Sequence, residues 1–318
     1  MNADQTLAPA QAPISGALPF PEIGGNLLHH TPMNIQTILR DLENLFRTGQ
    51  YAEVEPYLLT HLKDARTQAD QPTQLTLLNE LMGFYRSVSR FADALNCAKQ
   101  AVTLMDSMGL QGSVHYATTL LNVATAYRAA GQTAHAIDLF GQVQTIYTTH
   151  HVRDAYLLGS LFNNLSLAHQ EAGDHAKAID CLSFALPLAE GRTNSTAEVA
   201  VTLTNLALSR IQLNQLDQAR TELRRAMQLF ESLSRPSAHY SAALAALGGI
   251  AHREGNTLEA VACFERALAD TQARYGKNIN YAMTLESLGV VLEHADPTRS
   301  QTLLDEADAL FAALQADA

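Results

Sequence analysis

The chain repeats itself with a period of about 41 residues, and this regularity constrains its fold more than any other feature. Seven small or turn-forming residues lie at intervals of 40, 42, 42, 41, 41 and 41 residues: Gly49, Ser89, Gly131, Gly173, Asn214, Gly255 and Asp296. Glycine adopts a positive φ without steric penalty, and asparagine tolerates it best among the other residues. Such regular reversals indicate a repeat protein in which one structural unit is used seven times.

The residues around each break predict a pair of antiparallel helices. Upstream, apolar residues recur at i, i+3, i+4 and i+7, which is the stripe of an amphipathic helix; one example is Leu120, Val123, Ala124 and Tyr127. Downstream, two columns of mostly small residues follow. The first column is Val54, Ala94, Ala136, Ala178, Ala219, Ala260 and Ser300, and the second is His61, Ala101, Val143, Ala185, Ala226, Ala267 and Ala307. Helices whose axes approach to about 8–10 Å leave no room for large side chains at their closest point.

The repeat pattern resembles that of tetratricopeptide-repeat proteins. It combines small and aromatic residues, as in Tyr127, Gly131, Ala136, Phe140 and Val143. The usual tetratricopeptide repeat has about 34 residues. The longer period here, and runs such as Leu-Phe-Asn-Asn-Leu at 161–165, are more similar to the long repeats of kinesin light chains and their bacterial relatives. The resemblance implies an all-α, right-handed α-solenoid of about seven helix pairs.

The chain is expected to divide into a lead-in and a repeat domain. Residues 1–33 contain five prolines, which disfavour both helix and sheet, so this segment is predicted to be disordered. No Lys or Arg precedes Arg40, so we expect no secretory signal. Residues 34–318 are predicted to form the repeat domain, and the apolar spacing from Leu303 to Leu314 predicts a C-terminal capping helix.

Charge and composition narrow the range of partners. The formal net charge is −11, which argues against a nucleic-acid or anionic-membrane surface. No apolar run approaches the roughly 18 residues that a membrane span requires. The three cysteines occupy equivalent places two repeats apart, too far for a disulfide, and are expected to be free and buried: Cys97, Cys181 and Cys263. We therefore expect neither nucleic acid nor membrane as a partner.

Searches for motifs that carry chemistry find none. The sequence has no Gly-rich phosphate loop, no His-Glu-x-x-His, no Gly-x-Ser-x-Gly, no Cys-x-x-Cys and no calcium loop. Its twelve histidines lack carboxylate or cysteine companions at ligand spacing. The sequence therefore predicts a non-enzymatic protein with no cofactor and no metal.

One column of polar residues is a candidate binding site. In the family that the chain resembles, the first helix of each repeat lines the concave surface, and an Asn just before the core Leu contacts bound peptide. Here that position reads Glu80, Asn122, Asn164, Asn205, Ala246 and Ser287, and the residue before it is Asn79 or Asn163 in two of the repeats. A primary amide offers both a donor and an acceptor, as a peptide unit does. The alternative is that the asparagines form an amide ladder that fixes the stacking of neighbouring repeats.

Two arginines extend the candidate site. Arg86 and Arg128 occupy the same position, one turn before the break, in neighbouring repeats. Together they could bind a carboxylate or a phosphate with the bidentate geometry of the guanidinium group. The alternative is ion pairing within the chain, with acids such as Glu80 or Glu171.

These features favour a cytoplasmic adaptor that holds a protein or peptide segment in the concave groove. Two alternatives remain open: a signal-peptide sensor, and a regulatory subunit of an enzyme encoded separately. The sequence leaves self-association open.

Overall fold

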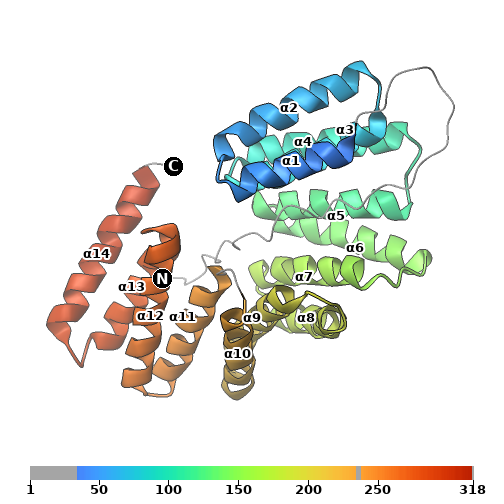
Figure 1. Cartoon of the computed structure of the whole chain (residues 1–318). Helices are drawn as coiled ribbons and strands as arrows, with labels where there is room; N and C mark the ends of the chain where they lie inside the picture. The colour runs from blue at the N-terminus through green and yellow to red at the C-terminus, as the bar shows by residue number, and fades with distance from the viewer. Residues whose placement is uncertain (1–33, 234–237, 317–318) are drawn as a thin grey trace. The chain divides into compact units, whose positions relative to one another are not determined.

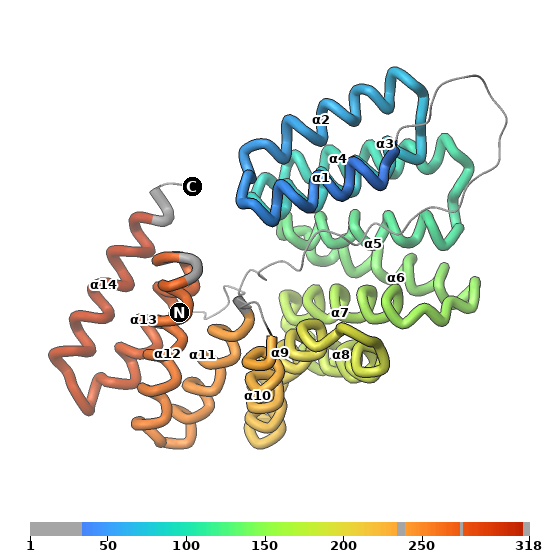
Figure 2. The backbone as a smooth tube through the Cα atoms, in the orientation of Figure 1, coloured from blue at the N-terminus to red at the C-terminus, as the bar shows by residue number. Residues whose placement is uncertain are grey.

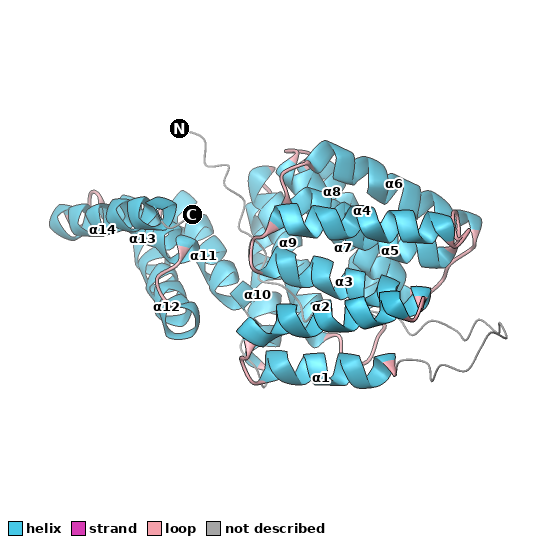
Figure 3. Cartoon of the chain, turned by 90° about the horizontal axis from the view of Figure 1, so that it is seen from above, coloured by secondary structure: helices cyan, strands magenta, loops and turns pink. Residues whose placement is uncertain are grey.

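The computed structural model describes residues 34–233 and 238–316, and the regular structure of these residues is helical throughout (Figures 1 and 3). The predicted disordered segment 1–33 lies outside the described residues. The helices are α1 Ile35–Arg47, α2 Tyr51–Thr67, α3 Gln71–Ser87, α4 Phe91–Ser107, α5 Val114–Ala129, α6 Thr133–Thr149, α7 Ala155–Glu171, α8 His175–Glu190, α9 Thr196–Gln212, α10 Leu216–Glu231, α11 Ala238–Arg253, α12 Thr257–Tyr275, α13 Ile279–Leu292 and α14 Pro297–Ala316. An odd-numbered helix and the one after it form a pair, so the prediction of seven helix pairs in an all-α solenoid is confirmed.

The turn within each pair follows from a residue with left-handed backbone. Six of the seven predicted break residues have φ between 56° and 76°. At the third break, Gly131 donates its N–H to the carbonyl of Arg128, and Gln132 donates to that of Tyr127, each at 2.9 Å. This is the Schellman arrangement, which satisfies the last carbonyls of a helix and turns the chain out of it.

The seventh break residue, Asp296, differs from this prediction. It is absent from the residues with positive φ, and its carboxylate oxygen Oδ1 accepts a hydrogen bond of 3.1 Å from the N–H of Arg299. The next residue, Pro297, begins α14. Proline is favoured at the first helical position and pushes the residue before it towards extended backbone. Asp296 therefore caps the N-terminus of α14, and it is not the residue that reverses the chain.

The two predicted columns of small residues lie in the core. All seven members of the first column and the six from Ala101 onward in the second are between 0% and 3% exposed, and His61 is half-buried. The one polar member of the first column, Ser300, donates a hydrogen bond of 2.7 Å from Oγ to the carbonyl oxygen of Gly289. Small residues thus mark the close approach of paired helices, as the spacing predicts.

The described residues form two compact units, which we call the N-terminal unit (34–157) and the C-terminal unit (158–316). In the N-terminal unit, the first helices α3 and α5 of neighbouring pairs pack against each other. In the C-terminal unit, α9 packs against α11 and α11 against α13, and helices α11 to α14 run side by side (Figure 2). Within each unit, neighbouring second helices make at most marginal contact with each other among the described residues. Each unit is therefore closer packed on the side of its first helices, and we call this side the inner face.

The predicted helix at the C-terminus lies within α14. This helix packs against α13 as the second helix of the seventh pair. Its role as a cap, and the treatment of residues 34–318 as one domain, stay predictions.

Candidate functional site

Two of the predicted amides bind each other. Asn122 on α5 donates from Nδ2 to Oδ1 of Asn79 on α3, with a distance of 2.9 Å between these atoms. Asn79 donates from Nδ2 to the carbonyl oxygen of Leu75 at 3.0 Å, and its Nδ2 lies 3.5 Å from Oγ1 of Thr119. The pair links the inner helices of neighbouring repeats, which is the geometry of an amide ladder.

A second polar link joins α7 and α9 in the C-terminal unit. Thr202 donates from Oγ1 to Oδ1 of Asn163 at 3.1 Å, and Gln170 donates from Nε2 to Oγ of Ser209 at 2.7 Å. The adjacent Asn164 donates from Nδ2 to the carbonyl oxygen of Ser160, one turn earlier in its own helix, at 2.8 Å. The threonine and the glutamine are partners that the Asn column by itself does not reveal.

Asn205 on α9 is used differently from the other amides. The residue is 7% exposed, and its backbone carbonyl accepts a hydrogen bond of 2.8 Å from Nε2 of Gln170. Its side-chain amide has no hydrogen-bond partner among the described residues. Of the predicted amides, this one keeps both its donor and its acceptor free.

The positive charges of Arg86 and Arg128 lie close enough to affect each other. Arg128 on α5 is 7% exposed, and Arg86 is half-buried at the end of α3. Burial lowers the pKa of Arg86 to about 10, and the positive charge of Arg128 contributes to the decrease. The buried Nε of Arg86 has no hydrogen-bond partner in the described chain. The ion pair between Arg86 and Glu80, the alternative that the sequence left open, is not found among the described residues.

Glu80 is a buried acid at the position that Asn122 and Asn164 occupy in later repeats. It is 4% exposed, and burial raises its pKa to about 8. A polar residue in this column would be expected on the open surface. The burial of Glu80 is therefore a feature that the sequence analysis did not predict.

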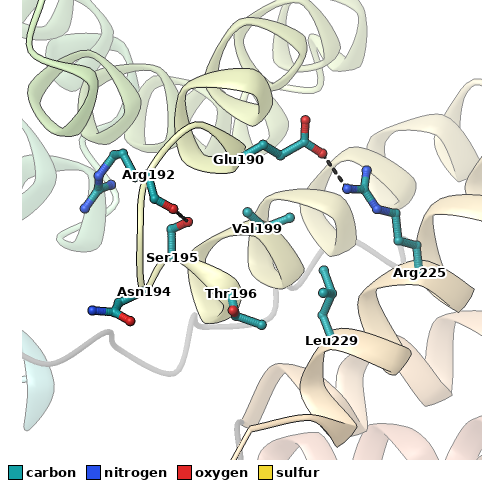
Figure 4. Close-up of a pocket in the computed structure, with 8 residues that line it drawn as sticks. All are labelled: Glu190, Arg192, Asn194, Ser195, Thr196, Val199, Arg225 and Leu229. Carbon is teal, nitrogen blue, oxygen red and sulfur yellow. Dashed lines mark hydrogen bonds and ion pairs between the residues drawn. The ribbon is translucent and has the colours of Figure 1, made fainter.

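The C-terminal unit also contains a small pocket beside the linker between α8 and α9 (Figure 4). It has a volume of about 270 Å³ and is lined by Glu190, Arg192, Asn194, Ser195, Thr196, Val199, Arg225 and Leu229. Nη2 of Arg225 lies 2.6 Å from Oε1 of Glu190, and Ser195 donates from Oγ to the carbonyl oxygen of Arg192 at 2.8 Å. Several polar groups that line the pocket therefore already bind each other or the backbone of the linker.

The described residues hold no cluster of three or more His, Cys, Asp or Glu side chains that could bind a metal. None of the described helices is long and apolar enough to span a membrane. The three cysteines are free, as predicted; Cys263 is half-buried, whereas Cys97 and Cys181 are buried, and burial raises the pKa values of these two to about 11. Their thiols are thus protonated at neutral pH, as expected for small core residues.

Comparison with known proteins relates this geometry to a repeat family. Residues 157–232 match the model of the tetratricopeptide repeat. A search among curated proteins found no match. BtubC (BKLC) from P. vanneervenii is 20% identical with a TM-score of 0.55, and the match covers 75% of this chain and 92% of that chain. The nearly identical tetratricopeptide-like repeats of a putative kinesin light chain from Podosopora anserina are 18% identical to this chain with a TM-score of 0.51, over 63% of this chain and 96% of that chain.

A third similar structure is that of NprR in complex with its cognate peptide NprX. It is 14% identical with a TM-score of 0.62, and the match covers 89% of this chain and 80% of that chain. At identities this low, the structural similarity establishes the fold alone, and the function must be argued from the site. The resemblance inferred from the repeat pattern is confirmed: the chain carries tetratricopeptide-like repeats and has the α-solenoid fold of the tetratricopeptide-repeat proteins, including those similar to kinesin light chains.

Proposed function

We propose that the chain is a non-enzymatic scaffold that binds a protein or peptide segment along the inner faces of its first helices. One observation carries the proposal: the inner helices hold polar groups whose hydrogen-bonding capacity the described chain does not use. These are the side-chain amide of Asn205 and Nε of Arg86. The amide of Asn205 can hydrogen-bond to a bound segment without breaking a side-chain contact inside the protein, because it has no partner among the described residues.

The other polar residues of the inner helices have a supporting role in this proposal. Asn79 and Asn122 join α3 to α5, and Asn163 joins α7 to α9 through Thr202. These links fix the spacing between successive inner helices. A fixed spacing reduces the entropy that is lost when an extended segment binds.

The amides of Asn205 and Asn164 are proposed to contact the backbone of the bound segment. A primary amide can donate to a peptide carbonyl and accept from a peptide N–H, so such contacts are independent of the segment's side chains. The complex of NprR with its peptide supports the proposal at the level of the shared fold. A cytoplasmic location and self-association stay predictions.

The experiment is a peptide-array screen of the full chain, followed by calorimetric titration of the peptides that bind. The double variant Asn164→Ala/Asn205→Ala is expected to bind these peptides at least about tenfold more weakly, the equivalent of 1.4 kcal/mol. Asn96→Ala is the matched control, because Asn96 is exposed on α4, a second helix. Equal affinities for wild type and the double variant, with unchanged thermal stability, would refute the assignment of these residues.

A further inference from the structure

A crevice opens between α2 and α4, the second helices of the first two pairs, and we call it the outer crevice. It has a volume of about 120 Å³ and belongs to the side of the second helices, not to the inner face. Its floor is apolar, and each floor residue is between 1% and 6% exposed: Leu62, Leu78, Leu81, Tyr85 and Cys97. An apolar cavity of about 150 Å³ accepts benzene, so the outer crevice has room for one aliphatic side chain.

The outer crevice has the form of a groove between two helices. Its walls extend from Leu59 to Arg66 on α2 and from Asp93 to Gln100 on α4. Seven positions of an α-helix correspond to a length of about 10 Å, or two turns. Nη2 of Arg66 donates to Oε1 of Gln100 at 2.5 Å and bridges the two walls. A groove of this length matches the contact surface of a helix better than that of a single small molecule.

Leu59, on the rim of the outer crevice, differs from its counterparts in the other repeats. It lies five residues after Val54, and the equivalent residues are small, polar or charged: Lys99, Gly141, Ser183, Arg224, Glu265 and Asp305. Leu59 is 44% exposed. A single exposed leucine is ordinary on a protein surface, but this one continues a buried apolar floor outward to solvent. A partner can therefore reach apolar surface here.

The rim of the outer crevice also carries positive charge. Lys63 and Arg66 lie about one turn apart on α2, and both are exposed. Neither forms an ion pair with a described residue, because the partner of Arg66 is the neutral amide of Gln100. The acid of the opposite wall, Asp93, is held by Nε of Arg90 at 2.7 Å. On a chain with a net charge of −11, this rim favours an acidic partner.

We propose that the outer crevice docks an acidic amphipathic helix of a partner protein, with one leucine of that helix inserted beside Leu59. A helix fits a groove between two helices because its ridges of side chains pack into the groove. A carboxylate one turn away from the inserted leucine would face Lys63 or Arg66. This helix binds on a different side of the chain from the segment on the inner face, so the inference does not rest on the proposed function.

The test observes the δ-methyl resonances of Leu59 in the full chain with ¹³C-labelled leucine methyl groups, assigned by their loss in Leu59→Ser. Four N-acetylated, amidated peptides serve as probes. The parent probe is a helix-forming peptide of Ala and Glu with one central Leu. The others replace this Leu by Gln, every Glu by Gln, or the residue before the Leu by Pro. The parent probe is expected to shift the resonances, less so at high salt, and the others to bind at least tenfold more weakly.

Two variants and two matched controls locate the docking surface by calorimetric titration of the parent probe. Leu59→Ser is expected to bind it about tenfold more weakly, and Lys63→Glu at least threefold more weakly. Leu258→Ser is the control for the leucine, because Leu258 is 86% exposed on another second helix, α12. Arg224→Glu is the control for the charge, because Arg224 is an exposed cation on α10. Both controls are expected to keep wild-type affinity and all four variants wild-type thermal stability.

Several results would overturn the inference. One is no shift of the Leu59 resonances at about 1 mM parent probe, and another is equal affinity of wild type and Leu59→Ser. If Asn164→Ala/Asn205→Ala weakened the parent probe as much as Leu59→Ser, the helix would bind on the inner face instead. Self-association of the wild type that is lost in Leu59→Ser would assign the outer crevice to a second copy of the chain. The scaffold function of the inner face stands in each of these cases.

Discussion

Asn122 on α5 donates a hydrogen bond of 2.9 Å to Oδ1 of Asn79 on α3, across 43 residues of sequence. The acceptor is itself held in place, because Nδ2 of Asn79 donates to the carbonyl oxygen of Leu75 in the preceding turn. Each half-buried amide therefore has a defined orientation. The pair fixes the position of one inner helix relative to the next, in the row of residues where the resemblance implies contact with a bound peptide.

Removing the donor of this pair should weaken the N-terminal unit. Asn122→Ala leaves Oδ1 of Asn79 without its donor, so we expect the free energy of unfolding to fall by about 1 kcal/mol. Asn122→Asp should cost more, because a carboxylate oxygen would face the Oδ1 that now accepts a hydrogen bond. Urea denaturation measures both effects. The exposed Asn96→Ala should stay within about 0.5 kcal/mol of the wild type. The linking role would be wrong if Asn122→Asp were as stable as the wild-type protein.

Ser89 carries backbone strain that its glycine counterparts avoid. Its φ is 58°, whereas Gly49, Gly131, Gly173 and Gly255 occupy the same turn position in other repeats. A non-glycine residue in the left-handed region costs roughly 1 kcal/mol. Ser89→Gly is expected to raise the free energy of unfolding by about 0.5–1 kcal/mol, as measured by chemical denaturation.

The reverse substitution in the next repeat is the control for this strain. Gly131 has a φ of 76°, and a Cβ atom there would have open space around it. Gly131→Ser should therefore lower stability through the backbone alone, by a similar amount. Changes of the same sign in the two variants would contradict the explanation.

Gly289 on α13 is required by the close approach of Leu304 on α14. A Cβ atom at Gly289 would lie 2.8 Å from both Cγ and Cδ2 of Leu304. Gly289→Ala is expected to destabilise the chain by about 1–3 kcal/mol, because overpacking outweighs the gain in helix propensity. Gly249→Ala is a matched control in α11, where a Cβ would meet nothing within 4 Å. It should stabilise by up to about 1 kcal/mol. Thermal unfolding of both variants distinguishes packing from propensity, and a stabilised Gly289→Ala would contradict the packing argument.

The fold was predictable because its constraints recur at one period. A left-handed turn selects Gly or Asn, and a close helix contact selects Ala, so positions such as Gly131 and Ala136 report on the architecture directly. The wrong prediction at Asp296 has a local cause, since Pro297 begins α14 and the preceding residue therefore caps this helix. A small or polar residue in register was not enough to distinguish the end of one helix from the start of another.

The candidate site was predictable only as a set of positions. The sequence places Asn79 and Asn122 on facing inner helices, but a ladder and a peptide contact both require an amide there. Which of the two an amide makes depends on how far it lies from the amide of the neighbouring repeat, and the sequence does not give this distance. The same limit applies to Arg86, whose position follows from the period while its unpaired Nε depends on which acids the fold brings near it.

The burial of Glu80 predicts a specific dependence of stability on pH. The ordinary pKa of a glutamic acid is 4.5, and burial raises that of Glu80 to about 8 in the folded chain. Between these values the folded state keeps a proton that the unfolded state releases, so the free energy of unfolding falls as the pH rises. The contribution is fully present below pH 4.5 and lost as the pH rises through 8. Its upper limit is about 1.4 kcal/mol for each pH unit in this window.

Glu80→Gln tests this sign, because glutamine is neutral at every pH. The variant is expected to gain stability relative to the wild type from about pH 5 to pH 8 in urea denaturation series. Glu55→Gln is the control of opposite sign. A hydrogen bond from Arg90 lowers the pKa of Glu55, so this carboxylate stabilises the fold above its ordinary pKa. Glu55→Gln should therefore lose stability relative to the wild type as the pH rises through about 4–5. Parallel curves for wild type and Glu80→Gln would show that Glu80 is ionised in the folded chain at little cost, and that its position is open to water.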